Sequence, residues 1–203
     1  PTTKSQLDFL QMLEQELKEL GFSNISLDLE DAYLVACIPS NLPKGKTAPA
    51  IGFVAHVDTA DFNAENIQPQ IHSNYDGKDI LLNSELGLMM RVEEFPNLKN
   101  YIGQTLITTD GTTLLGADDK AGLVSILEAG IDLLVNPEIP HGDIWVAFGP
   151  DEEIGKGAHR FKAERMPAQF AYTLDSGVVG KLEYETFNAA RAVVKINGTS
   201  VHP

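Results

Sequence analysis

The chain has 203 residues, enough for one α/β domain or for one domain and part of another. Its 29 acidic and 15 basic residues give a formal net charge of −14, which argues against nucleic acid and membrane surfaces as partners, because both are bound through basic surfaces. Cys37 is the only cysteine, which excludes an intrachain disulfide and favours a reducing compartment, so we expect a cytoplasmic protein.

The first half of the chain predicts one helix followed by short strands. Leucines at helical spacing predict a helix over 4–20, and Gly21 is placed to end it. Apolar patterns predict strands over 25–29, 33–38 and 51–57. Residues 59–100 have poor periodicity, and we interpret them as a long excursion with minor strands, of the kind that often borders a site.

The second half alternates strands with helices. The turn-forming pair at 110–111 predicts a hairpin between strands over 106–109 and 113–115. Helices are predicted over 120–135 and 156–164, and strands over 144–148, 170–174 and 179–184. This alternation indicates an α/β sandwich with a mixed or parallel sheet, in which ligands bind at the carboxyl ends of the strands.

Acidic side chains and one imidazole follow the predicted apolar segments. They are His56, Asp58, Asp118, Asp119, Glu152, Glu153 and Asp175. Adjacent carboxylates repel each other, and burying them unpaired is costly, so a positive charge is expected among them. Carboxylate and imidazole groups are common metal ligands, and together they predict a site for divalent cations.

Each of these clusters also has a purely structural explanation. A lone histidine on a strand is more often a core residue, but Asp58 beside His56 fits the carboxylate that commonly accepts a hydrogen bond from a metal-bound imidazole. One of the two adjacent aspartates, most naturally Asp119, can be explained as a helix cap. Glu152 and Glu153 have the alternative of a solvated loop. In the functional interpretation, one of them binds metal and the other transfers a proton from the attacking water to the leaving amine.

Four segments in this order resemble the M20 metallopeptidase family, and within it the tripeptide aminopeptidases. They span residues 52–59, 114–122, 150–158 and 172–175, and the intervening text fits as well, so the resemblance covers essentially the whole chain. It implies an α/β fold in which helices flank a mixed sheet, as in zinc peptidases, with an inserted α+β lid and dimerisation domain. It also implies small peptides as substrates, and no nucleic-acid or membrane partner.

The resemblance further implies a pair of zinc ions (Zn2+). His56 and Asp175 would bind one zinc ion, Asp118 would bridge both ions, and Glu153 would bind the second. The peptide bond between Asp118 and Asp119 is expected to be cis.

The same resemblance implies the catalytic and substrate-binding residues. Glu152 would be the general base, and Asp58 would orient the imidazole of His56. His202 would be the histidine that the second domain contributes to the substrate site. In relatives that dimerise through this domain it reaches the partner subunit, so a homodimer is expected.

The expected domains are a catalytic zinc-binding domain over 1–186 and the first strand of the inserted lid domain over 187–203. The family takes a further zinc-binding histidine from a C-terminal segment beyond these residues, and relatives carry another stretch ahead of residue 1. We therefore expect a fragment that lacks both ends, lacks one zinc ligand and is itself inactive.

The expected activity of the parent protein is release of the N-terminal residue from tripeptides. A deacylase or carboxypeptidase that acts on acylated amino acids or dipeptides has the same metal ligands and stays open as an alternative. A non-catalytic metal-binding relative is the other alternative, which the intact set of clustered residues disfavours.

Overall fold

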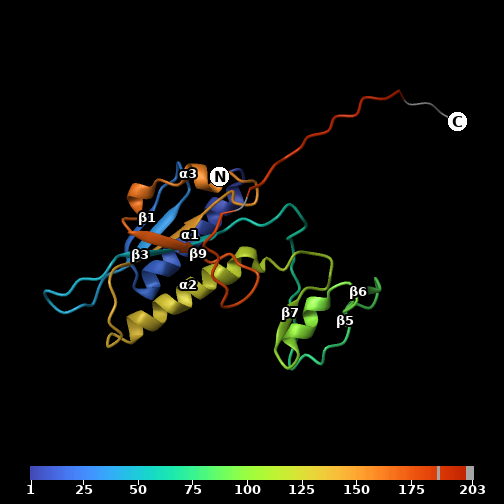
Figure 1. Ribbon diagram of the computed structural model, residues 1–203, viewed down its shortest axis with the longest axis horizontal. Helices are drawn as coiled ribbons and strands as arrows, with labels where there is room; N and C mark the ends of the chain where they lie inside the picture. The colour runs from blue at the N-terminus through green and yellow to red at the C-terminus, as the bar shows by residue number, and fades with distance from the viewer. Residues whose placement is uncertain (187, 200–203) are drawn as a thin grey trace.

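A five-stranded mixed sheet forms the centre of the computed structural model, which describes residues 1–186 and 188–199 (Figure 1). The strands lie in the order β1 (Ser23–Leu27), β2 (Leu34–Ile38), β8 (Ile144–Gly149), β3 (Ile51–His56) and β9 (Phe170–Thr173). The first three pair antiparallel, whereas β8, β3 and β9 are parallel. The predicted mixed α/β sheet is confirmed.

The three parallel strands bring three loops to one edge of the sheet. In register, β3 runs beside β8 until His56 pairs with Gly149, and beside β9 until Val54 pairs with Thr173. The segments that follow these strands therefore leave from the same side, the carboxyl edge, where the ligand sites of such sheets are found.

One face of the sheet is covered by α1 (Lys4–Leu20) and α2 (Ala117–Val135) (Figure 1). Their apolar stripes pack on the sheet through Leu10, Leu13, Leu17, Leu123, Ile126 and Leu127. Gly21 ends α1 in the left-handed conformation at φ 91°, as predicted, and its N–H bonds to the carbonyl of Lys18. In the described part of the chain, no helix is long and apolar enough to cross a bilayer.

The opposite face carries a smaller apolar cluster and two short helices, α3 (Gly157–Arg160) and η2 (Ala163–Arg165), where a single short helix over 156–164 was predicted. Arg165 fastens this layer to the sheet. Its guanidinium donates to both carboxylate oxygens of Asp31 and to the carbonyls of Tyr33 and Ser26.

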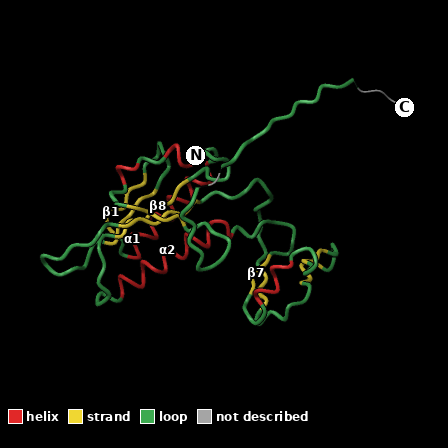
Figure 2. Tube along the Cα trace, viewed as in Figure 1, coloured by secondary structure: helices red, strands yellow, loops and turns green. Residues whose placement is uncertain are grey.

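The excursion between β3 and α2 forms a small unit that projects away from the sheet, as Figure 2 shows. It contains β4 (Gln70–His72), β5 (Ile80–Asn83), β6 (Leu88–Met90), η1 (Pro96–Tyr101) and β7 (Leu106–Thr108). The hairpin predicted through residues 110–111 is wrong, because β7 pairs with β4. Asp110 does close a turn by accepting the N–H of Thr112, but Leu114 then bonds to Asn63, and the chain continues into α2.

The strand predicted over 179–184 is also wrong. Val179, Leu182 and Tyr184 suit a strand, but no residue of 179–184 pairs with another strand in the described part of the chain, and Val179 is fully exposed. A strand forms only where a neighbour takes up its backbone hydrogen bonds. Residues 188–199 are likewise exposed and outside any strand, and the lid domain predicted from residue 187 stays a prediction.

Candidate metal centre

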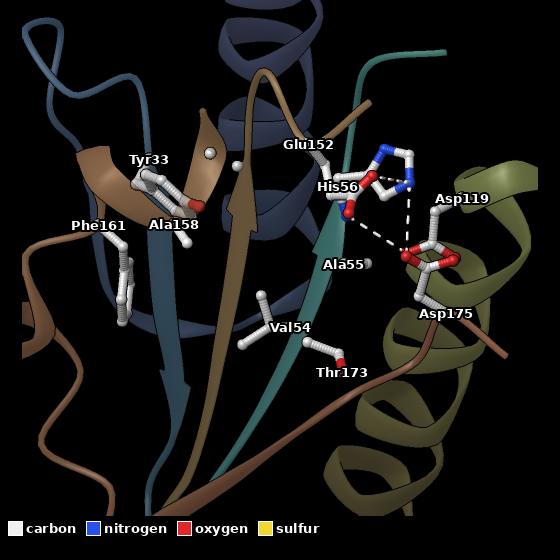
Figure 3. Close-up of a pocket in the computed structure, with 12 residues that line it drawn as sticks. Tyr33, Val54, Ala55, His56, Asp119, Glu152, Ala158, Phe161, Thr173 and Asp175 are labelled. Carbon is white, nitrogen blue, oxygen red and sulfur yellow. Dashed lines mark hydrogen bonds and ion pairs between the residues drawn. The ribbon is translucent and has the colours of Figure 1, made fainter. Parts of the chain in front are cut away.

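His56 occupies the last position of β3, at the carboxyl edge of the sheet, and is 6% exposed. Its Nε2 lies 2.9 Å from Oδ1 of Asp118, at the start of α2. The same nitrogen lies 3.7 Å from Oδ2 of Asp175 and 3.9 Å from Oε2 of Glu152, and Figure 3 shows these two carboxylates facing the imidazole. Three carboxylates from separate stretches of sequence thus surround one nitrogen of His56.

Three of these residues offer donor atoms that meet closely enough to share a cation. One atom each from His56, Asp118 and Asp175 all lie within 4.8 Å of one another. One imidazole with two carboxylates is a donor set that suits zinc and related divalent ions. The residues present therefore fit one metal ion.

Asp58 fixes the orientation of the imidazole. His56 Nδ1 donates to the carbonyl oxygen of Asp58 at 3.0 Å and lies 3.3 Å from its carboxylate. Because a carbonyl can only accept, Nδ1 carries a proton, so Nε2 is the nitrogen that would bind a metal ion once the ring has lost its second proton. The Asp58 carboxylate also accepts the backbone N–H groups of Glu152 and Glu153, each at 3.1 Å, and so ties the acidic loop to the histidine.

The chain is similar over its whole length to known peptidases. It is 61% identical over 203 residues to peptidase T of Fusobacterium nucleatum, covering 100% of this chain and 48% of that protein. The solved aminopeptidase PepT of Bacillus cereus is 31% identical over 86% of this chain and 39% of its own, with a TM-score of 0.60. A solved tripeptidase of Staphylococcus aureus is 26% identical over 83% of this chain and 37% of its own, with a TM-score of 0.58.

The chain is a homologue of peptidase T. It spans about half the length of the curated peptidase T sequences that it matches. No protein-family model matches it.

The electrostatics of this peptidase T homologue are those of crowded carboxylates around one imidazole. Burial lowers the pKa of His56, but the hydrogen bond and charge of Asp58, with the nearby Asp118 and Asp175, outweigh it and raise this pKa to about 9. Burial, and after it the charge of Asp118, raises the pKa of Asp175. Burial also raises the pKa of Glu152, to which the charge of Asp175 adds. A cation among these groups would offset their mutual repulsion.

Asp119 lies behind the histidine. The peptide bond that joins it to Asp118 is cis, as the resemblance implied. Asp118 and Asp119 have non-helical backbone angles, so the regular part of α2 begins after Asp119, whose carboxylate accepts the backbone N–H of His56 at 3.3 Å. The interpretation of Asp119 as a helix cap stays a prediction. Burial, and after it the charge of Asp175, raises the pKa of Asp119 to about 6.

Two predicted site residues are not brought into this group. Glu153 donates its backbone N–H to Asp58, but its exposed side chain is not among the three that meet closely enough to share a cation. Glu153 instead lines a separate hollow together with Lys120, whose ammonium donates to the carbonyl of Val57 at 2.6 Å. His202 lies outside the described residues.

Gly122 is a site residue that the sequence analysis missed. A Cβ atom at this position would lie 1.9 Å from the carbonyl oxygen of Leu174 and 2.4 Å from Oδ1 of Asp119, so only glycine lets α2 approach these two neighbours. The available signal was the glycine itself, because a glycine inside a helix costs about 1 kcal/mol relative to alanine and usually has a packing reason.

A cavity of about 350 Å³ opens beside the metal centre (Figure 3). His56, Glu152 and Asp175 lie along its polar side. Tyr33, Val54, Ala158 and Phe161 supply an apolar wall. A volume of a few hundred Å³ with a few polar groups at one side is typical of sites for small organic ligands.

Proposed function

We propose that this chain is the metal-binding part of an aminopeptidase that releases the N-terminal residue from tripeptides. The observation that carries the proposal is the convergence of His56, Asp118 and Asp175 at the carboxyl edge of the sheet. The names of the similar proteins, peptidase T, aminopeptidase and tripeptidase, support the same activity.

The proposed cofactor is a pair of zinc ions. His56 and Asp175 would hold the first ion, Asp118 would be shared by both ions, and Glu153 would be a ligand of the second. A divalent cation at such a site lowers the pKa of water toward ~7 and polarises a carbonyl oxygen. These two effects are what peptide hydrolysis at neutral pH requires.

Glu152 is the proposed general base. Its side chain is 55% exposed and points toward the imidazole, so it can meet a substrate and solvent. It takes a proton from the attacking water and delivers it to the leaving amine. The raised pKa of Glu152 suits this exchange, because a carboxylic acid with a higher pKa holds the proton longer before passing it on. Asp58 keeps the imidazole of His56 in the orientation that leaves Nε2 toward the centre.

Further proposals follow from the resemblance. Residues 1–186 are the proposed catalytic domain, and 187–203 the proposed start of a lid domain that supplies His202 to the substrate site. A homodimer through this lid and a cytoplasmic location complete the proposal. The apolar wall beside the centre supports small peptides as substrates.

A substrate panel tests the proposed activity in the parent protein that contains this chain. Hydrolysis is measured on a tripeptide, the corresponding dipeptide, an N-acetylated tripeptide and an N-acetylated amino acid, before and after chelation. We expect hydrolysis of the free tripeptide alone, with loss on chelation and recovery on addition of zinc. Equal rates on the free and acetylated substrates would contradict an aminopeptidase and support the deacylase alternative. Zinc binding without hydrolysis of any substrate would support a non-catalytic relative.

A further inference from the structure

Asp151 directly precedes the proposed general base, and the mechanism above assigns it no role. It is 1% exposed, although it carries a carboxylate. Its φ of 59° places it in the left-handed region, which non-glycine residues adopt rarely and aspartate more readily than most. A buried charge in an uncommon backbone conformation beside a catalytic group calls for a physical reason.

The carboxylate of Asp151 is bonded by donors from Thr2, which precedes α1, and from α1 and α3. The backbone N–H of Thr2 reaches both oxygens, at 3.0 and 3.1 Å, and the hydroxyl of Thr2 donates as well. The amide of Gln6, on α1, donates at 3.0 Å. On the other side, Nε of Arg160, in α3, lies 3.0 Å from Oδ2. With both oxygens engaged, this group serves as an anchor and not as a proton carrier.

The backbone of Asp151 is held by the same neighbours. Its N–H donates to Oε1 of Gln6 at 2.9 Å, so the buried side chain of Gln6 forms hydrogen bonds with both the backbone amide and the carboxylate of Asp151. Its carbonyl accepts the N–H groups of Lys156 and Gly157, both at 2.9 Å, which folds residues 151–157 into a closed loop. Glu152 leaves from this anchored point, and its own N–H is held by Asp58.

We propose that Asp151 is a positioning residue, which joins the start of α1 to α3 and thereby fixes the direction in which the Glu152 side chain reaches the metal centre. The inference rests on the proposed function for its catalytic consequence. Glu152 Oε2 lies 3.9 Å from His56 Nε2, so a small rotation at residue 151 would carry it out of reach of a water at the centre. A displacement of about 1 Å can cost on the order of 10²-fold in rate.

Asp151→Asn tests the proposal in the parent protein, with Asp31→Asn as the matched control. Asparagine keeps the size of the side chain and tolerates the left-handed conformation, but it weakens the bonds to Thr2 and Arg160. Asp31 is a second buried aspartate, paired with Arg165 and outside the metal centre, so its variant reproduces the loss of a buried ion pair without touching the acidic loop. The readouts are kcat, KM, bound zinc and melting temperature.

We expect Asp151→Asn to lower kcat by about 10²-fold while KM and bound zinc stay near wild type. Asp31→Asn should lower the melting temperature and leave kcat near wild type. Gln6→Ala removes the two hydrogen bonds between Gln6 and Asp151 without altering any charge, and it should also lower kcat. This variant provides the test should Asp151→Asn fail to fold. Wild-type kcat in both Asp151→Asn and Gln6→Ala would overturn the positioning role, as would an equal loss of kcat in Asp31→Asn.

Amide hydrogen exchange separates this inference from the proposed function. In Asp151→Asn the amides of residues 155–157 should exchange at least about tenfold faster than in wild type, and in Asp31→Asn at the wild-type rate. A wild-type protein that hydrolyses no tripeptide would refute the proposed function, and the exchange rates would still decide whether Asp151 holds the loop. Unchanged exchange in Asp151→Asn would overturn the inference whatever the activity.

Discussion

Gly122→Ala is the substitution that most sharply tests how α2 is fitted to the metal centre. A Cβ atom at this position would lie 1.9 Å from the carbonyl oxygen of Leu174, and restoring an ordinary contact of 3.4 Å needs a movement of 1.5 Å. The obstacle is backbone, and it is itself held in place, because the N–H of Leu174 donates to the carbonyl of Val54. The segment that moves carries Asp175, a proposed metal ligand.

The magnitude of the effect follows from two opposing contributions. Alanine in place of a helix-interior glycine stabilises a helix by about 1 kcal/mol. Overpacking a tight contact costs typically 1–3 kcal/mol, and here the larger value applies, because a carbonyl and the Asp119 carboxylate are both displaced. We expect a net destabilisation of about 2 kcal/mol. Displacement of Asp175 should also weaken zinc binding by at least about tenfold, which corresponds to 1.4 kcal/mol.

Gly130→Ala is the matched control on the same helix. The Cβ atom there would lie 2.5 Å from Cζ of Phe22 and 3.0 Å from Cδ1 of Ile38, which are side-chain atoms outside the metal centre. Thermal unfolding and competitive zinc titration of both variants separate stability from metal binding. Gly130→Ala should lose stability and keep its zinc affinity. Wild-type zinc affinity in Gly122→Ala would refute the reasoning.

Three further predictions concern the same site and the core. Glu152→Gln should keep its bound zinc and lose about 10²–10⁴-fold in kcat on tripeptides. Metal analysis and steady-state kinetics of the parent protein would measure the two effects, and unchanged kcat would show that Glu152 is not the general base. His56 should release a proton when zinc binds, because its pKa in the metal-free protein is about 9. The apparent zinc affinity should therefore fall about tenfold for each pH unit below that value, which zinc titrations at pH 6, 7 and 8 would measure. The same raised pKa means that protonated His56 stabilises the metal-free protein; this stabilisation is complete below pH 6.5 and is lost as the pH rises through about 9. A zinc affinity that does not change with pH would contradict the raised pKa, and with it both the affinity and the stability prediction. Cys37 is 2% exposed, and burial raises the pKa of its thiol to about 11. Its thiol should therefore resist alkylation at pH 8 until the protein unfolds. Rapid labelling of the folded protein would contradict the buried position of β2.

The parts of the fold that could be predicted are those whose signal is local. The leucine spacing of α1 and the left-handed Gly21 that ends it involve only neighbouring residues. The buried strands β3 and β8 were marked by uninterrupted apolar runs, and the acids that follow them were therefore expected at one edge of the sheet.

The errors arose where the partner lies far away in the sequence. Residues 110–111 form the expected turn, but β7 pairs with β4, which precedes it by more than thirty residues, and a local turn signal carries no information about that partner. Residues 179–184 have apolar or aromatic side chains at Val179, Leu182 and Tyr184, and they find no neighbouring strand among the described residues. A segment with strand-forming residues becomes a strand only when it pairs with another strand, so composition alone led to a wrong strand prediction over 179–184.

For the candidate site, too, the sequence predicted what depends on local signals and missed what depends on distant contacts. The order of the motifs indicated which residues belong to a metal centre, but whether a carboxylate turns toward His56 depends on tertiary packing. Asp119 was explained locally as a helix cap, and that local explanation could not foresee the contact of its carboxylate with the backbone of β3. Glu152 and Glu153 are adjacent in sequence and both donate their backbone N–H groups to Asp58, but the side chain of Glu152 lies 3.9 Å from the imidazole, a difference that sequence alone does not give.

Equilibrium zinc binding to this chain tests the central claim most directly, by comparison of the wild type with His56→Gln, Asp118→Asn and Asp175→Asn. If the three side chains share one cation, each substitution should weaken binding by at least about tenfold, and the double substitution of His56 and Asp175 should weaken it by less than the product of the single effects. Wild-type affinity in any one of the three single variants, with the fold intact, would contradict a metal centre built from these residues.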